Sequence, residues 1–294
     1  MDATIIIPSY RSERTIEQCL QSLSTQNTKF TYEIIVIDSS PNGRIDSITR
    51  RFSKVKLLSL IDKAYAGIAR NIGSMQAQGE LLVFIDADIV VPSNWLDKVI
   101  KYYKMGHNVF SGAIDIWDGE RNNLLNKLEW FYEFSEFKSS MQKGERWCLP
   151  AAALAIKKVI FQNEQFHNME TSEDVDLTIR LRNKGNGIYF NPELKVFHIF
   201  HTNFRGLLRK AFNFGMSNMQ LRCIYHISGS RVVKNKVLML IAIPSFALIK
   251  FIKISWRNIK YNEQYDSLLY IRTSPLMIVV IIMWMLGAYK IIFN

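Results

Sequence analysis

The first 115 residues alternate short apolar runs with amphipathic stretches. The apolar runs predict buried strands over 4–7, 33–37 and 81–85, and a further strand is predicted over 54–60. Pro8 is expected to end the first strand. Between them, apolar residues recur every three or four positions, which predicts helices over 12–23, 66–76 and 93–103. Ser12 and Ser93 are the expected N-caps of two of these helices. Strands that alternate with helices are typical of a mostly parallel sheet covered on both faces, so we predict an α/β fold.

The alternation of strands and helices lapses after about residue 115. An aromatic-rich helix is predicted over 122–138, and a second helix with acids in its first turn over 171–184. A short strand is predicted over 196–200, around His198. These elements extend the first domain to about residue 200, with one half at about 1–115 and the other at about 116–200.

The net charge of +11 is confined to one segment of the chain. Residues 1–200 hold 24 Lys and Arg against 24 Asp and Glu, whereas residues 201–260 hold 11 basic residues and no acid. Such a cationic segment attracts polyanions, either anionic lipid headgroups or nucleic acid. The adjoining apolar sequence favours lipid, and no nucleic-acid-binding module is recognisable, so nucleic acid is not an expected partner. The three cysteines lie far apart, which argues against a disulfide framework.

Two apolar stretches overlap or follow the cationic segment. They cover 237–252, where Lys250 is the one charged residue, and 275–289, which has no charge. A membrane span needs about 20 apolar residues, so each stretch is borderline, and a pair of buried helices in a soluble protein is the alternative. We favour membrane association, because 275–289 has no polar face and a basic flank is typical of the cytosolic side. The predicted organisation is an α/β domain at 1–200, a basic membrane-interface segment at 201–236 and hydrophobic membrane helices at 237–294.

Asp86-Ala87-Asp88 directly follow the predicted strand over 81–85. If they continue the strand, both carboxylates face the same way and can bind one hard cation such as Mg²⁺ or Mn²⁺. Such a cation completes its shell with water and phosphate oxygens, so the site suits a nucleotide diphosphate. Asp38 also follows a predicted strand, and ligands of such sheets bind beyond the carboxyl ends of the strands. We therefore expect Asp38, Asp86 and Asp88 to share one crevice.

Four segments resemble family-2 glycosyltransferases with a GT-A fold, in their residues, order and spacing. They are TIIIPSYRSERTIEQCLQSL, YEIIVIDSS, GIARNIGSMQAQGELLVFIDADIVVPSNWL and SEDVDLTIRLRNKGNGIYFNPELKVFH, and together they cover about residues 3–200. The resemblance implies a Rossmann-like GT-A domain, a nucleotide-sugar donor and a divalent cation, Mg²⁺ or Mn²⁺, as cofactor.

The resemblance also implies roles for individual residues. Contacts with the nucleotide-sugar are implied for Pro8, Ser9, Tyr10, Asp38, Arg70, Asp86 and Ala87. Metal ligands are implied at Asp86, Asp88 and His198. Asp174 of SEDVDL is implied to be the general base of an inverting transfer, and Trp147 and Glu173 are implied to contact the acceptor.

Each of these roles has an ordinary structural alternative: Asp38 can be a turn acid, and His198 can be a partly buried histidine whose hydrogen bonds are satisfied within the fold. The acids at the start of the 171–184 helix can complement the helix dipole, and Arg70 can be a surface charge. The aromatic residues of 122–138 and Trp147 can be packing residues rather than a platform for a sugar. Two segments depart from the family pattern: DSS stands in place of the usual DDGS, and QFHNMETSED in place of the usual GGFDE. These departures leave the nucleotide pocket and the acceptor geometry open.

Together these features predict an inverting, metal-dependent glycosyltransferase on the cytoplasmic face of a bacterial-type inner membrane. We expect it to transfer one sugar from a UDP-sugar to a hydroxyl of a glycan or lipid-linked saccharide, in cell-surface polysaccharide synthesis. A hydroxyl acceptor is preferred because a polyprenyl phosphate is already ionised and needs little help from a base. Transfer to polyprenyl phosphate and a non-catalytic nucleotide-sugar-binding membrane scaffold are the alternatives.

Overall fold

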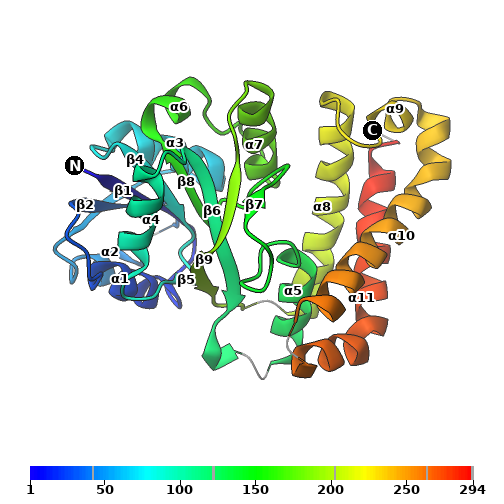
Figure 1. Cartoon of the computed structure of the whole chain (residues 1–294), viewed down its shortest axis with the longest axis horizontal. Coiled ribbons are helices and arrows are strands. Elements are labelled where there is room, and N and C mark those ends of the chain that lie inside the picture. The colour runs from blue at the N-terminus through cyan, green and yellow to red at the C-terminus, as the bar shows by residue number, and fades with distance from the viewer. Residues whose placement is uncertain (42, 121–122, 202, 263, 293–294) are drawn as a thin grey trace. The chain divides into compact units, whose positions relative to one another are not determined.

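The chain forms two compact units. The computed structural model describes every residue except 42, 121–122, 202, 263 and 293–294. Unit 1 consists of Met1–Trp117 and Phe137–Ile199, and unit 2 consists of Asp118–Glu136 and Phe200–Asn294 (Figure 1). The predicted half-domain at about 116–200 therefore includes a segment, 118–136, that packs with the C-terminal residues.

The first half of unit 1 alternates strands and helices. Its four parallel strands are β1 (Ala3–Ser9), β2 (Tyr32–Asp38), β3 (Val55–Ser59) and β4 (Leu81–Ile85). The helices are α1 (Ile16–Ser24), the short α2 (Asp46–Thr49), α3 (Ala66–Gln76) and α4 (Trp95–Lys104). The predicted α/β fold is therefore confirmed.

The second half of unit 1 extends the same sheet with strands of both orientations. They are β5 (Ile89–Val90), β6 (Val109–Ile116), β7 (Gly144–Glu145), β8 (Ala153–Lys157) and β9 (Tyr189–His198). The strand order is β3-β2-β1-β4-β8-β6-β9-β5, with β7 paired to β9. Because β8 runs antiparallel to β4 and β6, whereas β6 and β9 are parallel, the sheet is mixed but mostly parallel. The helices α6 (Lys158–Asn163) and α7 (Glu173–Asn183) belong to this half.

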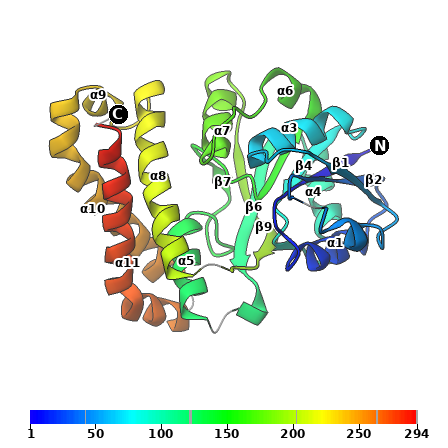
Figure 2. The same ribbon diagram turned by 180° about the vertical axis from the view of Figure 1, so that it is seen from behind.

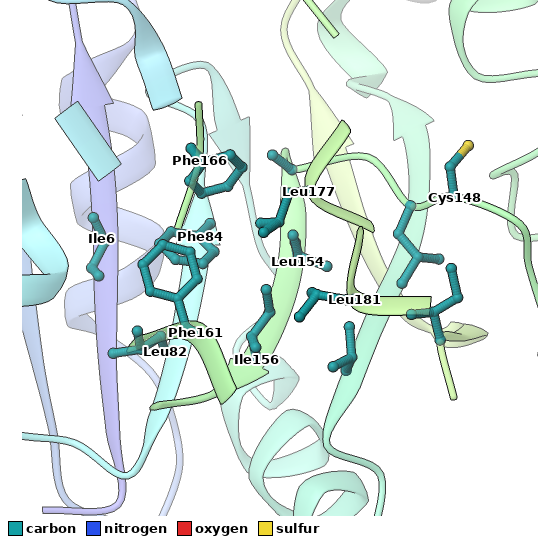
Figure 3. Packing of buried hydrophobic residues seen from close by; sticks show 14 of the residues in the cluster. Ile6, Leu82, Phe84, Cys148, Leu154, Ile156, Phe161, Phe166, Leu177 and Leu181 are labelled. Atoms are coloured by element: carbon teal, nitrogen blue, oxygen red, sulfur yellow. The ribbon is translucent and has the colours of Figure 1, made fainter. Parts of the chain in front are cut away.

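A hydrophobic core connects one face of the sheet to α3, α6 and α7. Alternate residues of neighbouring strands contribute to it, because successive side chains of a strand point to opposite faces. Figure 3 shows the packing of its members Ile6, Leu82, Phe84, Cys148, Leu154, Ile156, Phe161, Phe166, Leu177 and Leu181. The ring of Phe84 lies 5.0 Å from that of Phe161 and 5.3 Å from that of Phe166, measured between centroids. This core holds α3 and α7 close to the strand ends where the candidate site forms.

Both expected N-caps are wrong. The residues in the cap positions are Thr15 and Asn94, one to three residues later than Ser12 and Ser93. The carbonyl oxygen of Ser12 accepts from the backbone N–H groups of Thr15 and Ile16, so the chain makes a turn before α1 begins. The Ser12 hydroxyl is used elsewhere, since it lies 2.6 Å from the hydroxyl of Ser9.

Several other predicted ends also shift. The strand β1 continues through Pro8, because its pairing with β4 ends at Ile6 and one edge of the strand is open where proline lacks its N–H. The predicted strand over 196–200 is the end of the longer β9. The predicted helix over 171–184 corresponds to α7, which begins two residues later and ends one residue earlier.

Unit 2 is helical in the residues that the structure describes. After a 3₁₀ turn at Asp118–Glu120, its helices are α5 (Leu124–Glu133), α8 (Phe204–Ile224), α9 (Ser230–Val233), α10 (Lys236–Lys260) and α11 (Gln264–Lys290). The predicted helix over 122–138 is thus shorter than expected, and its first residue, 122, lies outside the described residues. Most of the segment predicted as a basic membrane interface, 201–236, is the helix α8.

The helix α11 packs against both α8 and α10 (Figure 2). Two glycines allow the backbones of α8 and α11 to come close. A Cβ atom at Gly215 would lie 1.8 Å from the carbonyl oxygen of Trp284, and one at Gly287 would lie 1.8 Å from that of Phe212. A larger residue at either position would therefore push the two helices apart.

The helices α10 and α11 are long and apolar enough to cross a membrane, judged by length and composition. In the most apolar part of each helix, only 22% of the residues of α10 and 33% of those of α11 are buried inside the protein. Large apolar side chains are exposed along both helices, among them Val237, Ile241, Leu248, Ile252, Leu268, Ile271, Ile278 and Ile282. A pair of buried helices would hide such residues, so this surface favours contact with lipid.

Two cations of the cationic segment, 201–260, are paired within unit 2. Lys210 of α8 forms ion pairs with Glu129 and Glu133 of α5, and Arg257 of α10 pairs with Glu136. The segment 118–136 thus supplies counter-ions to cations that follow these acids by more than 70 residues in the chain. The charge available to an external polyanion is correspondingly smaller than the sequence count indicates.

We predict that Gly73→Val destabilises unit 1 by about 1–3 kcal/mol of unfolding free energy, the usual range for overpacking a core. A Cβ at Gly73 of α3 would lie 2.5 Å from Ile37 Cδ1 and 2.6 Å from Ile6 Cγ2, so the helix must move away from the sheet. Chemical denaturation in mild detergent measures the change. The exposed Gln76→Val on the same helix is the control, and an unchanged midpoint for Gly73→Val would contradict the prediction.

Candidate active site

Ser9 and Asp38 meet at the carboxyl ends of the neighbouring strands β1 and β2. The hydroxyl of Ser9 donates to Asp38 Oδ1 at 3.0 Å, and the hydroxyl of Ser40 donates to the same oxygen at 2.7 Å. Both predicted residues are buried, with Asp38 at 1% and Ser9 at 3% exposure. The two hydroxyl groups therefore orient the Asp38 carboxylate at this edge of the sheet.

A cavity of about 750 Å³ adjoins the end of β3. It is lined by residues 59–65, together with Ile68 of α3 and Asn168. The loop is anchored next to Asp38, because the N–H of Leu60 donates to the Asp38 carbonyl oxygen at 2.7 Å. The ammonium group of Lys63 lies 4.9 Å from the ring centroid of Tyr10 and 5.9 Å from that of Tyr65. The volume is within the range of small-molecule sites, and polar and aromatic groups surround it.

Asp86 and Asp88 lie in a turn between β4 and β5. The N–H of Ile89 donates to the carbonyl oxygen of Asp86 at 3.1 Å, which closes the turn. The expectation that the two acids continue the strand is therefore wrong, because the chain turns here to place β5 beside β9. The two carboxylates have different neighbours: Asp86 contacts Arg70, and Asp88 contacts His198.

Arg70 of α3 is buried between two carboxylates. Its Nη2 lies 2.6 Å from Asp86 Oδ1, and its Nη1 lies 2.7 Å from Glu173 Oε1. The side chain is only 3% exposed, so the structural alternative of a surface charge does not apply. The Phe166 ring covers the guanidinium, with its centroid 5.3 Å from Cζ. Arg70 therefore connects α3, the turn after β4 and the first turn of α7.

His198 is held beside Asp88 by the backbone. It pairs with Ile89 in the antiparallel contact of β9 with β5, and the N–H of Ile199 donates to the Asp88 carbonyl oxygen at 2.8 Å. The imidazole Nε2 then lies 3.5 Å from Asp88 Oδ1. The imidazole is 12% exposed and the Asp88 carboxylate 34%, so a ligand can approach this pair from solvent.

Asp86, Asp88 and His198 offer carboxylate oxygens and an imidazole nitrogen, which suit Mn²⁺ or Mg²⁺. Among the described residues, no group of three or more His, Cys, Asp or Glu side chains is placed to hold a metal by itself. A cation at this position would therefore take part of its shell from water and from phosphate oxygens of a ligand. These residues fit a cation that binds together with a diphosphate.

Asp174, the predicted base, lies in the first turn of α7 next to Glu173. Its Oδ2 accepts from the N–H of Ala151 at 3.1 Å, and its Oδ1 accepts from the N–H of Val175 at 2.8 Å. Burial and, after it, the negative charge of Glu173 raise the pKa of Asp174 to about 7. The Ala151 hydrogen bond and the positive charge of Arg70 act in the opposite direction. A carboxyl group with such a pKa can exchange a proton near neutral pH.

The remaining predicted residues range from buried to exposed. Pro8 is part of β1, and Ala87 is buried in the turn between Asp86 and Asp88. Tyr10 is 38% exposed, and its ring faces the cations of Lys63 and Arg11. Trp147, between β7 and β8, is 41% exposed. The contacts at the site therefore group the predicted residues as Ser9 with Asp38, Arg70 with Asp86 and Glu173, and Asp88 with His198.

Two groups at the site escaped the sequence-based prediction. The side-chain amide of Asn71 holds both backbone groups of Phe166: its Nδ2 donates to the carbonyl oxygen at 2.8 Å, and its Oδ1 accepts from the N–H at 3.1 Å. This contact fixes the loop before α7 to the helix that carries Arg70. The position of Asn71 directly after Arg70 was a usable signal. The second group is the backbone N–H of Ala151, which donates to Asp174. Because it is a backbone group, no residue type in the sequence marks it.

Comparison with known proteins identifies the family. The model of the family described as "Glycosyl transferase family 2" matches residues 4–213. An uncharacterized glycosyltransferase of Nostoc sp. is 26% identical over 170 residues, which are 55% of this chain and 52% of the relative. The poly(ribitol-phosphate) beta-N-acetylglucosaminyltransferase TarS of Staphylococcus aureus is 27% identical over 114 residues, which are 37% of this chain and 20% of TarS. The matched segments thus span about half or less of the lengths of these relatives.

Solved structures share the fold at low sequence identity. A mannosyltransferase from Pyrobaculum calidifontis in complex with GDP-Man and Mn²⁺ is 16% identical, with a TM-score of 0.64, over 98% of this chain and 86% of the other. The 1–349 fragment of S. aureus TarS in complex with UDP-GlcNAc is also 16% identical, with a TM-score of 0.57, over 99% and 90% of the two chains. These likenesses confirm the predicted GT-A fold. With the family match over 4–213, the chain belongs to glycosyl transferase family 2.

Proposed function

We propose that this protein is an inverting, metal-dependent glycosyltransferase that transfers one sugar from a nucleotide-sugar to a hydroxyl of a saccharide acceptor. The observation that carries the proposal is the position of Asp174: a carboxyl group with a pKa of about 7 lies one residue from the partner of Arg70, which also binds Asp86. A group suited to general-base chemistry thus adjoins residues suited to a diphosphate and its cation. A binding scaffold does not require such a base.

The nucleoside half of the donor would bind at the carboxyl ends of β1, β2 and β3. The buried Asp38 carboxylate, oriented by Ser9, can accept hydrogen bonds from a base or a ribose. The cavity at the end of β3 has space for a nucleoside, and the exposed ring of Tyr10 lies against Lys63, one of the residues that line this cavity. A UDP-sugar is the first donor to test, because TarS, which shares the fold, binds UDP-GlcNAc.

The diphosphate would lie between Arg70 and the Asp88–His198 pair. Asp86, Asp88 and His198 would hold a divalent cation, which when bound neutralises the charge that develops on the leaving diphosphate. The mannosyltransferase that shares the fold is in complex with both GDP-Man and Mn²⁺, which supports a cation that binds together with the donor. The guanidinium of Arg70 would bind phosphate oxygens of the same diphosphate.

Asp174 would accept the proton of the acceptor hydroxyl as its oxygen attacks the anomeric carbon. The new bond forms on the face opposite the departing nucleoside diphosphate, so the configuration at that carbon is inverted. The hydrogen bonds from Ala151 and Val175 hold the carboxylate in one orientation for this transfer. A lipid-linked saccharide or a glycan is the proposed acceptor, because its hydroxyl needs a base and a polyprenyl phosphate does not.

The proposed location is the cytoplasmic face of the inner membrane, where the enzyme would contribute to cell-surface polysaccharide synthesis. The exposed apolar surfaces of α10 and α11 and the exposed cations Arg231, Lys234, Lys236, Lys253 and Lys260 support contact with an anionic bilayer. Nucleotide-sugars and lipid-linked acceptors would then meet at one surface.

We predict that nucleotide binding depends on the cation site. In calorimetry with UDP and Mn²⁺, Asp88→Asn should raise the Kd by at least about tenfold, or about 1.4 kcal/mol, because one charged ligand of the cation is lost. EDTA should raise the Kd of the parent protein for UDP to a similar extent. Asp46→Asn, which removes an acid on α2 that pairs with Arg50, is the control. If Asp88→Asn binds like the parent, the metal assignment is wrong.

The assignment of Asp174 predicts a separation of binding from transfer. Asp174→Asn should bind the nucleotide-sugar with unchanged Kd and lower the kcat of transfer by about 10²–10⁴-fold, because it removes a general base. Radiolabelled donor and a panel of saccharide acceptors measure the transfer. Retained kcat in this variant would rule out Asp174 as the base.

The same assignment predicts the direction of the pH dependence. The base must be deprotonated, and the pKa of Asp174 is raised to about 7. The kcat/KM of the parent should therefore rise with pH through about 7 and level off above it, whereas the residual activity of Asp174→Asn should lack this step. An activity that falls with increasing pH across this range would contradict the role.

We predict that the whole chain floats with lipid vesicles in a density gradient and does not bind oligonucleotides. Anionic vesicles should bind more protein than neutral ones, and salt should reduce this difference, because the cations are exposed. Ile241→Glu combined with Ile249→Glu should weaken flotation, since both side chains are exposed on α10. Val159→Glu, at an exposed position of unit 1, is the control. A parent chain that stays at the bottom of the gradient would favour buried helices.

A further inference from the structure

The two carboxylates that bind Arg70 have different surroundings. The Asp86 side chain is 32% exposed and lies in the turn that also contains Asp88. The Glu173 side chain is only 12% exposed and lies at the start of α7. The Nε of Arg70 is buried and has no hydrogen-bond partner among the residues that the structure describes. The guanidinium is therefore held by its two ion pairs, one accessible to a ligand and one less accessible.

Donor binding would affect these two ion pairs unequally. In the proposed function, Asp86 is one of the residues that hold the cation, so its charge is shared and its attraction for Arg70 decreases. A guanidinium that is 3% exposed cannot remain in place without a counter-ion, because an uncompensated buried charge is strongly unfavourable. Glu173, which approaches Arg70 at 2.7 Å from the other side, can supply that charge.

We propose that Glu173 is a positioning residue that keeps Arg70 at the donor site while Asp86 turns to the donor and its cation. Arg70 would then keep Nη1 on Glu173 and present Nη2 to a phosphate oxygen of a nucleoside diphosphate. This inference rests on the proposed function and specifies how its donor site is held. It differs from the role implied by the family resemblance, in which Glu173 contacts the acceptor.

Nucleotide binding without an acceptor distinguishes the two roles of Glu173. The probe is whichever of UDP, GDP, ADP, CDP or dTDP the parent binds in calorimetry with Mn²⁺, using the whole chain in mild detergent. Glu173→Gln should raise the Kd for this nucleotide about tenfold, since Arg70 loses the counter-ion that holds it in the site. An acceptor contact would instead leave this Kd unchanged and raise only the KM for the acceptor, which would overturn the inference.

Glu170→Gln is the matched control. Glu170 lies three residues before Glu173 and is exposed, so its substitution removes the same charge from the same region. The Kd of this variant should equal that of the parent. If both variants weaken binding equally, the effect is a general loss of negative charge and the inference is wrong.

A double-mutant cycle tests whether Glu173 acts through Arg70. Arg70→Gln should weaken nucleotide binding, and adding Glu173→Gln to it should cause no further loss, because the group that Glu173 positions is already gone. The double variant contains no buried guanidinium that lacks a counter-ion, so it provides the test even if Glu173→Gln alone fails to fold. An additional loss in the double variant would overturn the inference. A parent that binds none of the nucleotides would instead overturn the proposed function itself.

Discussion

The candidate site depends on one buried cation and the two acids that neutralise it. Arg70 is 3% exposed, and a guanidinium in that position requires carboxylates at hydrogen-bonding distance. Asp86 follows it by 16 residues and Glu173 by 103, so the cation connects three segments that are distant in the chain. These contacts fix the turn after β4, the helix α3 and the start of α7 relative to one another. The Asn71 contact with Phe166 reinforces the same connection through the backbone.

The state of Asp174 is a consequence of this arrangement. Burial raises its pKa most, Glu173 raises it further, and the Ala151 N–H and Arg70 lower it. The same residue, Glu173, thus neutralises Arg70 and also disfavours a second negative charge next to itself. The balance leaves the Asp174 carboxyl near the pH at which a hydroxyl proton can be accepted and later released. A less buried acid at the position of Asp174 would keep an ordinary pKa, and its main effect would be a favourable interaction with the helix dipole.

The sequence predicts the elements of unit 1 well where burial produces a local pattern of apolar residues. The strands β1, β2 and β4 are short apolar runs, because central strands covered on both faces have no polar side. The bounds of α3 agree with its apolar periodicity, whereas α1 and α4 begin after a turn that the position of a single serine does not reveal. The sequence pattern does not predict the helix α8, because the charges of this segment indicate a membrane interface, although the buried residues Leu207, Ala211 and Gly215 recur every four positions.

The contacts of the candidate site are also of two kinds: some follow from the order of neighbouring strands, and others depend on how distant segments pack. That Asp38 and Ser9 would meet follows from parallel strand ends, and the register of β1 and β2 brings them to hydrogen-bonding distance. The orientation of Asp86 toward Arg70, and the pairing of Arg70 with Glu173, depend on how α3 and α7 pack across the core. No residue pattern within either helix encodes that packing. The same limit applies to the cationic segment, 201–260. In a count of charges along the chain, Glu129, Glu133 and Glu136 belong to residues 1–200, whose charges sum to zero. In unit 2 these acids neutralise Lys210 and Arg257, so the attraction for an anionic surface rests on the cations that remain exposed.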